Sequence, residues 1–166
     1  MAHRDRTYIS VFFDQTTIQH VINYIQLSKI PNPVSEDDLH CTLILDDEDA
    51  IVDYVPICNY TPHMIGVPYK LDVWKTLTGK NCLVLIFKCK ALDDRHDLIV
   101  QENQSKHYYP QYISHITLSY DIGDLRIDSL PNVTDYISKI IILGECNPNY
   151  TCYDKEIEND AYDKRC

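Results

Sequence analysis

The pattern His-x-Thr occurs twice in this chain, each time inside a run of apolar and β-branched residues. The first copy is His40-Cys41-Thr42, and the second, 75 residues later, is His115-Ile116-Thr117. Side chains alternate between the two faces of an extended strand, so the histidine and threonine of each copy project from the same face. Two such strands can bring two imidazoles and two hydroxyls to one cleft, and this requirement constrains the fold more than any other feature.

The segments before the two motifs follow the same order. Residues 8–13 have the branched and aromatic composition of a strand. Asp14 is a candidate helix cap, and apolar residues spaced three to four apart then predict an amphipathic helix that ends near Ser28. In the second half, residues 81–89 form the nearly continuous apolar run of a central strand. Residues 91–105 predict a second helix with three inward side chains, Leu92, Leu98 and Ile99.

The remaining apolar segments complete the predicted core. Residues 51–56 and 63–77 contain strand-like pieces that are interrupted by proline and glycine, and residues 133–143 close the core. Each half therefore runs strand, helix, His-x-Thr strand. This order predicts an α+β fold of two lobes, pseudo-symmetric strand–helix–strand halves that face each other across a central cleft.

Length and charge limit the organisation and the partners. We expect one domain over residues 1–166, with a polar tail from about residue 147. The formal net charge is −10, which argues against long nucleic acid because such binding needs a basic surface. No signal-peptide region and no long apolar stretch is found, so we expect an intracellular protein without membrane contact. We also expect a monomer. Its expected location is the cytoplasm, that of the host cell if the chain is viral.

The cysteines do not indicate a covalent or metal framework. There are seven, an odd number, and no Cys-x-x-Cys pair is present. The sequence therefore predicts neither a set of disulfides nor a zinc site, and we interpret most of these residues as small buried side chains.

Two histidines and two threonines meet the needs of phosphodiester cleavage through a ribose 2′-hydroxyl. The reaction needs a base for the hydroxyl proton, an acid for the leaving 5′-oxygen, and donors for the phosphoryl oxygens. Imidazole suits both proton transfers because its ordinary pKa is about 6.5. Threonine hydroxyls would bind the non-bridging oxygens. We expect no metal and no cofactor, and the sequence leaves open which histidine is the base.

The alternative interpretation is that each motif histidine is structural and each threonine an ordinary strand residue. Two copies of the pattern, both followed by leucine, favour the functional interpretation. The other histidines lack such a pattern, and we expect them to be structural or exposed. They are His3, His20, His63, His96 and His107.

The two motifs resemble the signature of the two-histidine (2H) phosphoesterase superfamily. The chain is also similar to the phage anti-CBASS cyclic-oligonucleotide nucleases. This similarity rests on the segment Ile30-Pro31-Asn32-Pro33-Val34, on the first motif that follows it, and on the closing Leu143-Gly144-Glu145. Those enzymes destroy the cyclic nucleotide messengers by which infected bacteria trigger a defence. The resemblance implies that His40 and His115 are the acid–base pair and that Thr42 and Thr117 hold the phosphate.

The same resemblance implies three residues that bind bases. Tyr8 and Trp74 would be stacking platforms, and Glu145 would accept a hydrogen bond from an adenine amino group. The alternatives are an ordinary strand tyrosine, a core or interface tryptophan, and an exposed carboxylate in a turn. Tyr150 and Tyr153 are candidates for a lid.

The predicted function is metal-independent hydrolysis of 3′–5′ bonds in cyclic di- and trinucleotides such as 3′,3′-cGAMP. One alternative is a 2H phosphoesterase that acts on 2′–5′ oligoadenylate or on RNA 2′,3′-cyclic phosphate ends. Another is a protein that binds and sequesters nucleotides without cutting them. A matched acid and base argue against sequestration, which needs neither.

Overall fold

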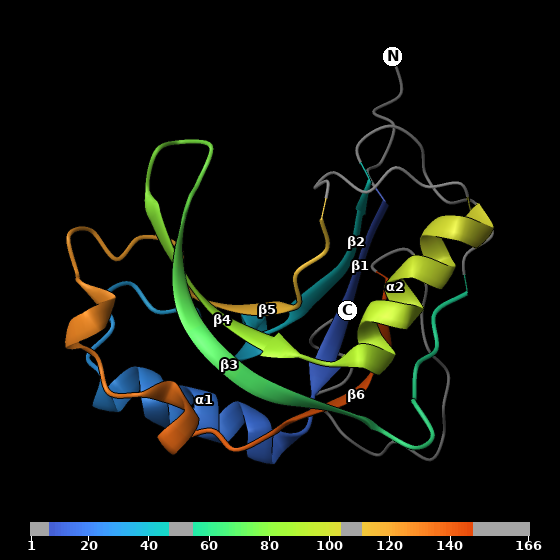
Figure 1. Ribbon diagram of the computed structural model, residues 1–166, viewed down its shortest axis with the longest axis horizontal. Coiled ribbons are helices and arrows are strands. Elements are labelled where there is room, and N and C mark those ends of the chain that lie inside the picture. The colour runs from blue at the N-terminus through green and yellow to red at the C-terminus, as the bar shows by residue number, and fades with distance from the viewer. Residues whose placement is uncertain (1–6, 47–54, 104–110, 148–166) are drawn as a thin grey trace.

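A computed structural model of the chain describes residues 7–46, 55–103 and 111–147. Its centre is one six-stranded sheet, in the order β2-β1-β6-β3-β4-β5, with antiparallel pairing throughout (Figure 1). The strands are β1 (Thr7–Phe13), β2 (Cys41–Asp46), β3 (Met64–Lys75), β4 (Asn81–Lys88), β5 (His115–Ser119) and β6 (Ile140–Cys146).

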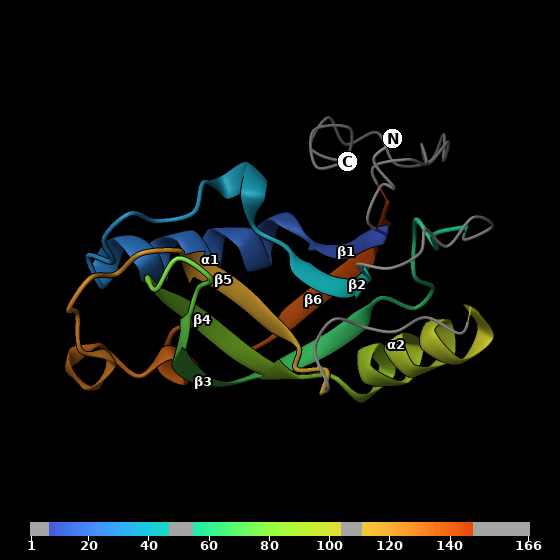
Figure 2. The same ribbon diagram turned by 90° about the horizontal axis from the view of Figure 1, so that it is seen from above.

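The sheet consists of two halves with the same connection. Helix α1 (Gln15–Leu27) joins β1 to β2, and helix α2 (Lys90–Asn103) joins β4 to β5. One half is β2-β1-β6 and the other is β5-β4-β3, so the two halves meet where β6 pairs with β3. The helices lie toward opposite ends of the molecule (Figure 2). The predicted α+β class and the repeat of strand, helix and motif strand are confirmed.

The two motif strands are the two edges of the sheet, and the sheet curls until these edges touch. Strands β2 and β5 are in contact although they stand at opposite ends of the strand order. The Val34 amide donates to the Leu118 carbonyl at 2.9 Å. The Tyr112 hydroxyl donates to the Thr42 carbonyl, also at 2.9 Å. The curl therefore brings together segments that are far apart in the chain.

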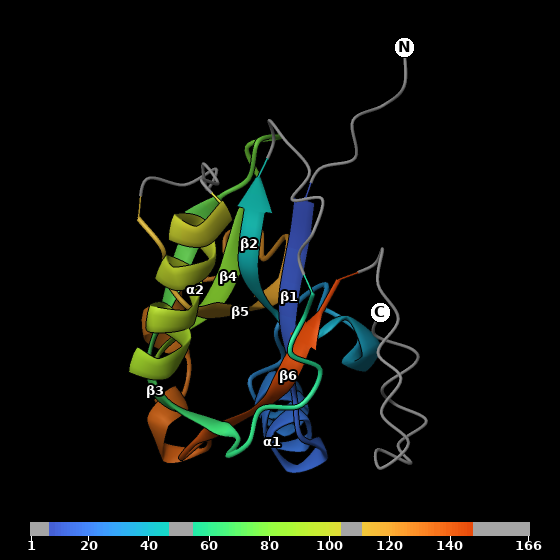
Figure 3. The same cartoon turned by 90° about the vertical axis from the view of Figure 1, so that its right-hand side faces the viewer.

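Helix α1 forms where its sequence pattern predicts. Asp14 caps it, because its Oδ1 accepts a hydrogen bond from the Thr17 amide at 2.8 Å. The helix ends at Leu27, with Ser28 as its C-cap. Figure 3 shows it below β6. Its buried face carries Thr17, Ile18, Val21, Tyr24 and Ile25, at the spacing of a helix that packs on a core.

Strand β4 is covered on both faces, as its apolar run predicts. All residues from Cys82 to Phe87 are buried. Leu83, Leu85 and Phe87 belong to the main core, which also receives apolar side chains from both helices. The alternate residues form a second cluster on the opposite face, packed against Trp74, and they are Cys82, Val84 and Ile86.

Helix α2 buries a different set of side chains from the predicted one. Leu92 and Ile99 are buried as predicted, but Leu98 is 43% exposed. His96 is buried in its place. Residues 92, 96 and 99 follow the helical spacing of four and three, whereas residue 98 is rotated by about 100° from residue 99. The prediction for Leu98 rests on its hydrophobicity alone, whereas the helical period determines which side chains are buried.

Strand β3 is continuous where the sequence predicts interrupted pieces, and β6 extends beyond the predicted end at residue 143. Strand β3 continues through Pro68, where a register shift between Pro68 and Lys70 marks a bulge that accommodates the missing amide proton. The segment before β6 holds the 3-10 helix η3 (Val133–Asp135), and the strand itself runs to Cys146. Two further 3-10 helices are η1 (Glu36–Asp38) and η2 (Ile127–Ser129).

The cysteines divide into two groups. Cys41, Cys82 and Cys89 are free and buried, as predicted. Cys58 and Cys146 are disulfide-bonded, which contradicts the expectation of no disulfides. Pairing depends on which thiols the fold brings together, and spacing along the chain does not reveal that.

Among the described residues, no helix is long and apolar enough to cross a membrane.

Candidate active site

The two motif histidines occupy equivalent places in the two halves. His40 directly precedes β2, and His115 is the first residue of β5. Both side chains are half-buried, as are those of Thr42 and Thr117. Because β2 and β5 are the edges that meet, the four side chains of the two motifs come from neighbouring strands. We call these four residues the paired-histidine site.

Each imidazole is held by the same local hydrogen bond. The Nδ1 atom of His40 lies 2.7 Å from the carbonyl oxygen of Asp38, and the Nδ1 atom of His115 lies 2.7 Å from that of Ile113. A carbonyl oxygen only accepts, so each Nδ1 carries the proton. The Nε2 atom of each ring is therefore the nitrogen that can gain or lose a proton, and the two neutral rings have the same tautomer.

Tyr8 of β1 lies beside the first motif. Its ring meets that of His40 edge-on, with centroids 6.0 Å apart, and its hydroxyl is 3.3 Å from the Thr42 Oγ1 atom. Burial raises the pKa of Tyr8 to about 12, so the phenol remains protonated and is a hydrogen-bond donor. The structure thus brings together three of the predicted site residues, Tyr8, His40 and Thr42.

Trp74 of β3 lies beside the second motif. Its indole packs against the His115 imidazole with centroids 4.5 Å apart. The indole N–H donates to the Asp72 Oδ2 atom at 3.0 Å, and the Asp72 Oδ1 atom accepts from the Val73 amide. Asp72 is a functional candidate that the sequence motifs do not include. Its position two residues before Trp74, on the same face of the strand, was the available signal.

The two histidines lie within electrostatic range of each other. The pKa of His115 is lowered from its ordinary value, chiefly because burial disfavours the charged ring. The hydrogen bond to Ile113 raises this pKa, while the charge of His40 lowers it further. His115 therefore favours the neutral form, with Nε2 unprotonated.

Tyr120 directly follows β5 and is a further residue that the sequence patterns do not single out. Burial raises its pKa, and the Thr117 side chain acts in the opposite direction, so Tyr120 lies beside the second motif. It also interacts electrostatically with Tyr8 across the site. The side chain is 55% exposed. No periodic pattern marks it, because it follows the last residue of β5.

Comparison with known proteins identifies the family. The family model described as anti-CBASS protein Acb1 matches residues 5–147. The chain belongs to the Acb1 family. It is 30% identical to the Acb1 protein of Vibrio phage KVP40 over 69% of this chain and 72% of the relative. It is 32% identical to the Acb1 protein of Acinetobacter phage Ac42 over 73% of this chain and 77% of the relative. It is 30% identical to the Acb1 protein of Enterobacteria phage T4 over 77% of this chain and 82% of the relative.

Solved structures show the same fold. The chain is similar to E. coli LigT complexed with phosphate, with a TM-score of 0.57 and 12% identity over 90% of both chains. It is also similar to E. coli LigT complexed with 3′-AMP, with a TM-score of 0.56 and 13% identity over 89% of both chains. The expected 2H phosphoesterase fold is thereby confirmed for this Acb1 family member.

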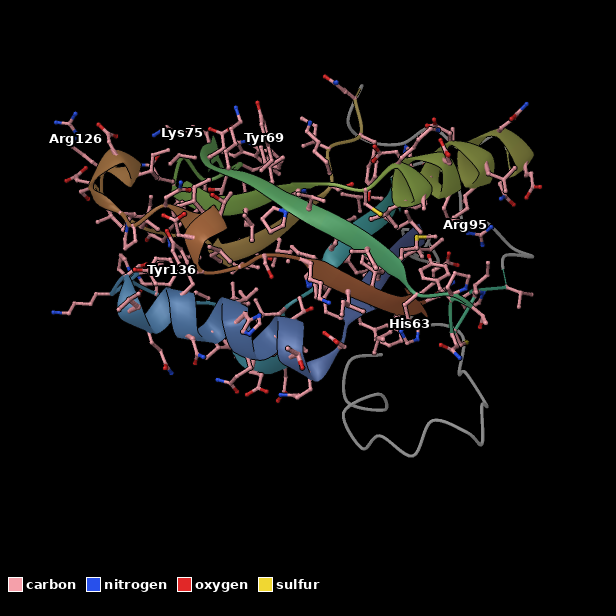
Figure 4. The ribbon with its side chains drawn as sticks, turned by 60° about the horizontal axis from the view of Figure 1, so that its bottom comes forward. His63, Tyr69, Lys75, Arg95, Arg126 and Tyr136 are labelled. Atoms are coloured by element: carbon pink, nitrogen blue, oxygen red, sulfur yellow. The ribbon has the colours of Figure 1, made fainter. Side chains whose placement is uncertain are left out.

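Glu145 does not lie where the family resemblance implies. Its side chain has no exposed surface. The Oε1 atom accepts from the Ile57 amide and from Arg95, and the Oε2 atom accepts from the Tyr60 hydroxyl and from Arg95 Nε at 2.7 Å. Figure 4 shows Arg95 at the α2 end of the molecule. Both oxygens accept hydrogen bonds from the protein itself, so in this structure neither is directed at a base.

The burial of Glu145 follows from the length of β6. The sequence pattern predicts that this strand ends at residue 143, with the carboxylate just beyond it. The strand continues, and Glu145 pairs with Val11 of β1, whose side chain belongs to the main core. Directly paired residues of antiparallel strands share a face, so Glu145 points toward the core side. In this chain its side chain joins β6, residues 57–60 and α2.

The other histidines are structural or exposed where the structure describes them, as predicted. His96 is buried, stacks on Tyr112 with centroids 4.0 Å apart, and has its Nδ1 atom 2.7 Å from the Leu43 carbonyl. His63 is exposed. His20 lies on α1 and lines a surface pocket together with Tyr136, and that pocket contains none of the motif side chains.

Some predictions fall outside the described residues. They concern His3, His107, Tyr150, Tyr153 and the tail beyond residue 147. Within the described ranges, no group of three or more His, Cys, Asp or Glu side chains is placed to hold a metal ion.

Proposed function

We propose that the chain is a metal-independent phosphodiesterase that cuts 3′–5′ bonds in cyclic di- or trinucleotides, 3′,3′-cGAMP among them. The observation that carries the proposal is the matched pair of imidazoles. Both have a protonated Nδ1 fixed on a carbonyl, and both lie next to a threonine from the same motif. A general acid and a general base of the same chemical type are what 2′-hydroxyl attack needs.

The first step begins with proton removal by His115. Its lowered pKa favours the neutral ring, so its Nε2 atom takes the proton of the ribose 2′-hydroxyl. The 2′-oxygen then bonds to phosphorus, and the bond from phosphorus to the 5′-oxygen breaks. His40, in its charged form, donates its Nε2 proton to that 5′-oxygen. The ring opens with a 2′,3′-cyclic phosphate at one end and a 5′-hydroxyl at the other.

The second step returns both histidines to their starting states. His40 is now neutral and accepts a proton from a water molecule that attacks the cyclic phosphate. The bond from phosphorus to the 2′-oxygen breaks, and His115 returns its proton to that oxygen. The product ends in a 3′-phosphate, and each imidazole has exchanged one proton in each direction.

The threonines stabilise the charge that develops on the phosphoryl oxygens. The Thr42 and Thr117 hydroxyls donate to the non-bridging oxygens, where negative charge increases in the transition state. Tyr8 keeps its proton and supports the Thr42 hydroxyl at 3.3 Å. These donors need no metal ion.

Two aromatic side chains beside the histidines favour a nucleotide substrate. Tyr8 and Trp74 each contact one motif histidine. A base that stacks on either ring contributes about 1–3 kcal/mol, whatever its identity. The solved LigT neighbours were complexed with phosphate and with 3′-AMP, which is consistent with this chemistry. The Acb1 family description, anti-CBASS, supports cyclic nucleotide messengers as the class of substrate.

A substrate panel tests the proposal. The purified chain is incubated in EDTA with 3′,3′-cGAMP, with 2′–5′ oligoadenylate, and with an RNA that ends in a 2′,3′-cyclic phosphate. We expect loss of the cyclic dinucleotide and formation of a product with one 3′-phosphate. The rate falls by about 10²-fold or more in His40→Ala and in His115→Ala.

The matched control is His20→Ala, which removes an exposed histidine on α1 and leaves the rate unchanged. Each alternative has its own outcome. Cleavage of oligoadenylate or of the RNA end alone favours a different substrate class. Tight binding of an unchanged cyclic dinucleotide favours sequestration. Activity that disappears with EDTA contradicts the metal-free mechanism.

A further inference from the structure

Two lysines from neighbouring strands converge on one exposed tyrosine. The Lys70 Nζ atom lies 5.6 Å from the ring centroid of Tyr69, and the Lys88 Nζ atom lies 4.9 Å from the same centroid. The Tyr69 side chain is 53% exposed. Figure 4 shows it on β3, on the side of the molecule away from α1. We call these three residues the lysine–tyrosine patch.

In the part of the chain that the structure describes, no carboxylate neutralises the positive charge of this patch. Neither Lys70 nor Lys88 has an ion pair with a carboxylate among the described residues. In contrast, Lys80 and Lys90 each bind an aspartate. The whole chain carries ten more acidic than basic residues. Two like charges on one ring repel each other, and an anion placed between them relieves that repulsion.

The bulge in β3 creates the patch. Val67 pairs with Lys88, and Lys70 pairs with Ile86. Tyr69 is therefore the additional residue of the bulge, without a counterpart on β4. An extra residue leaves its backbone unpaired and redirects side chains, a device common beside active sites. Without the bulge, strict alternation would place residues 67 and 70 on opposite faces of β3.

The patch lies on the same face of the sheet as the second motif. Ile86 of β4 pairs with Lys70 on one side and with His115 on the other. Directly paired residues share a face, and neighbouring strands lie about 4.8 Å apart. The Cα atoms of Lys70 and His115 are therefore about 10 Å apart across two strands. A flexible lysine side chain covers part of that distance, which brings its ammonium toward a nucleotide bound at the histidines.

We propose that Lys70 and Lys88, held over the ring of Tyr69, form a second phosphate-binding site that takes the phosphodiester of the substrate that is not cut. The inference rests on the proposed function, because it concerns the same nucleotide. A cyclic dinucleotide has two phosphodiesters, and only one is positioned between the histidines at a time. The patch supplies the positive charge that the other one requires in an acidic protein.

A charge-neutral double variant tests the site. Lys70→Gln with Lys88→Gln is compared with wild type on 3′,3′-cGAMP and on a linear dinucleotide with a single 3′–5′ phosphodiester. A contact to the uncut phosphate binds ground state and transition state alike, so it acts on KM. We expect KM for the cyclic substrate to rise by about tenfold or more, with kcat changed by less than about threefold. KM for the linear substrate changes by less than about threefold.

Two controls separate a specific site from net charge. Lys75→Gln with Lys139→Gln removes the same charge from two exposed lysines outside the patch and leaves KM for the cyclic substrate unchanged. Lys70→Arg with Lys88→Arg keeps the charge and restores most of the affinity. An unchanged KM in the glutamine variant contradicts the site. An equal rise in the control, or an equal rise for the linear substrate, contradicts it as well.

Binding measurements distinguish the site from the proposed function. Calorimetry of 3′,3′-cGAMP with the His115→Ala protein needs no cleavage. If replacing Lys70 and Lys88 with glutamine weakens this binding, while the wild-type protein cuts nothing, the proposed function is contradicted and the site is supported. If the wild-type protein cuts the substrate but the glutamine substitutions leave binding unchanged, only the second phosphate-binding site is contradicted. No binding at all contradicts both.

Discussion

The indole of Trp74 packs against the imidazole of His115, with ring centroids 4.5 Å apart and an interplanar angle of 61°. This contact keeps water from one side of the imidazole, and burial is the main cause of the lowered pKa of His115. Trp74 therefore affects the protonation of His115, in addition to any contact with a nucleobase.

Replacing Trp74 with alanine is expected to raise the pKa of His115. Burial lowers this pKa, so exposure returns it toward its ordinary value of 6.5. Because the base must be neutral, the acidic limb of the pH–rate profile moves to higher pH. Trp74→Phe retains a ring and gives a smaller shift. The pKa is measured from the imidazole proton resonances by NMR, and an unchanged value in Trp74→Ala contradicts the role of burial.

Asp72 is expected to act as a positioning residue for Trp74. Its two oxygens accept from the indole N–H and from the Val73 amide, and asparagine has a single oxygen for both. Trp74 is the one tryptophan of the chain, so its fluorescence reports this side chain alone. We expect Asp72→Asn to shift the emission to longer wavelength and to lower kcat/KM severalfold. Asp124→Asn, at an exposed position, leaves both unchanged.

The motif threonines are expected to act through their hydroxyls. Thr42→Val and Thr117→Val keep the branched shape but remove the donor, so kcat for 3′,3′-cGAMP falls by about 10²-fold in each. The serine variants retain a hydroxyl and keep most of the activity. If valine and serine variants at one position are equally slow, the hydroxyl at that position is not the group that matters.

Glu145 is expected to contribute to stability and not to recognition of a base. Glu145→Ala leaves Arg95, whose side chain is 15% exposed, without its carboxylate partner. Loss of one partner of a buried ion pair costs about 3–5 kcal/mol of the free energy of unfolding. Urea denaturation measures the loss. Asp94→Ala, which breaks an exposed pair with Lys90, costs far less.

A kinetic comparison separates the two roles of this carboxylate. If Glu145 read an adenine, Glu145→Gln would raise KM for an adenine-containing cyclic dinucleotide while the protein stayed as stable as wild type. We expect the reverse, a less stable protein whose folded fraction has an unchanged KM.

The sequence predicts those parts of the fold that depend on local periodicity. The spacing of two in each His-x-Thr places imidazole and hydroxyl on one face, and the spacing of three to four defines α1. The unbroken apolar run of β4 predicts that both faces of this strand are buried. Each of these patterns is complete within one segment, so no knowledge of distant residues is required.

Features that depend on two segments are not visible in the sequence. The contact of β2 with β5 arises from the curl of the whole sheet. The lysine–tyrosine patch depends on the bulge after Pro68, which a proline alone does not specify. The burial of Glu145 depends on residues 57–60 and on Arg95, which lie far from it in the chain.

The pH dependence of kcat/KM for 3′,3′-cGAMP in EDTA, from about pH 5 to about pH 9, tests the paired-histidine mechanism most directly. The rate is expected to rise as His115 loses its proton, with a midpoint below the ordinary value of 6.5, and to fall at higher pH, where the general acid is no longer protonated. The profile is then bell-shaped. A measurable rate that stays flat across this range contradicts acid–base catalysis by the two imidazoles.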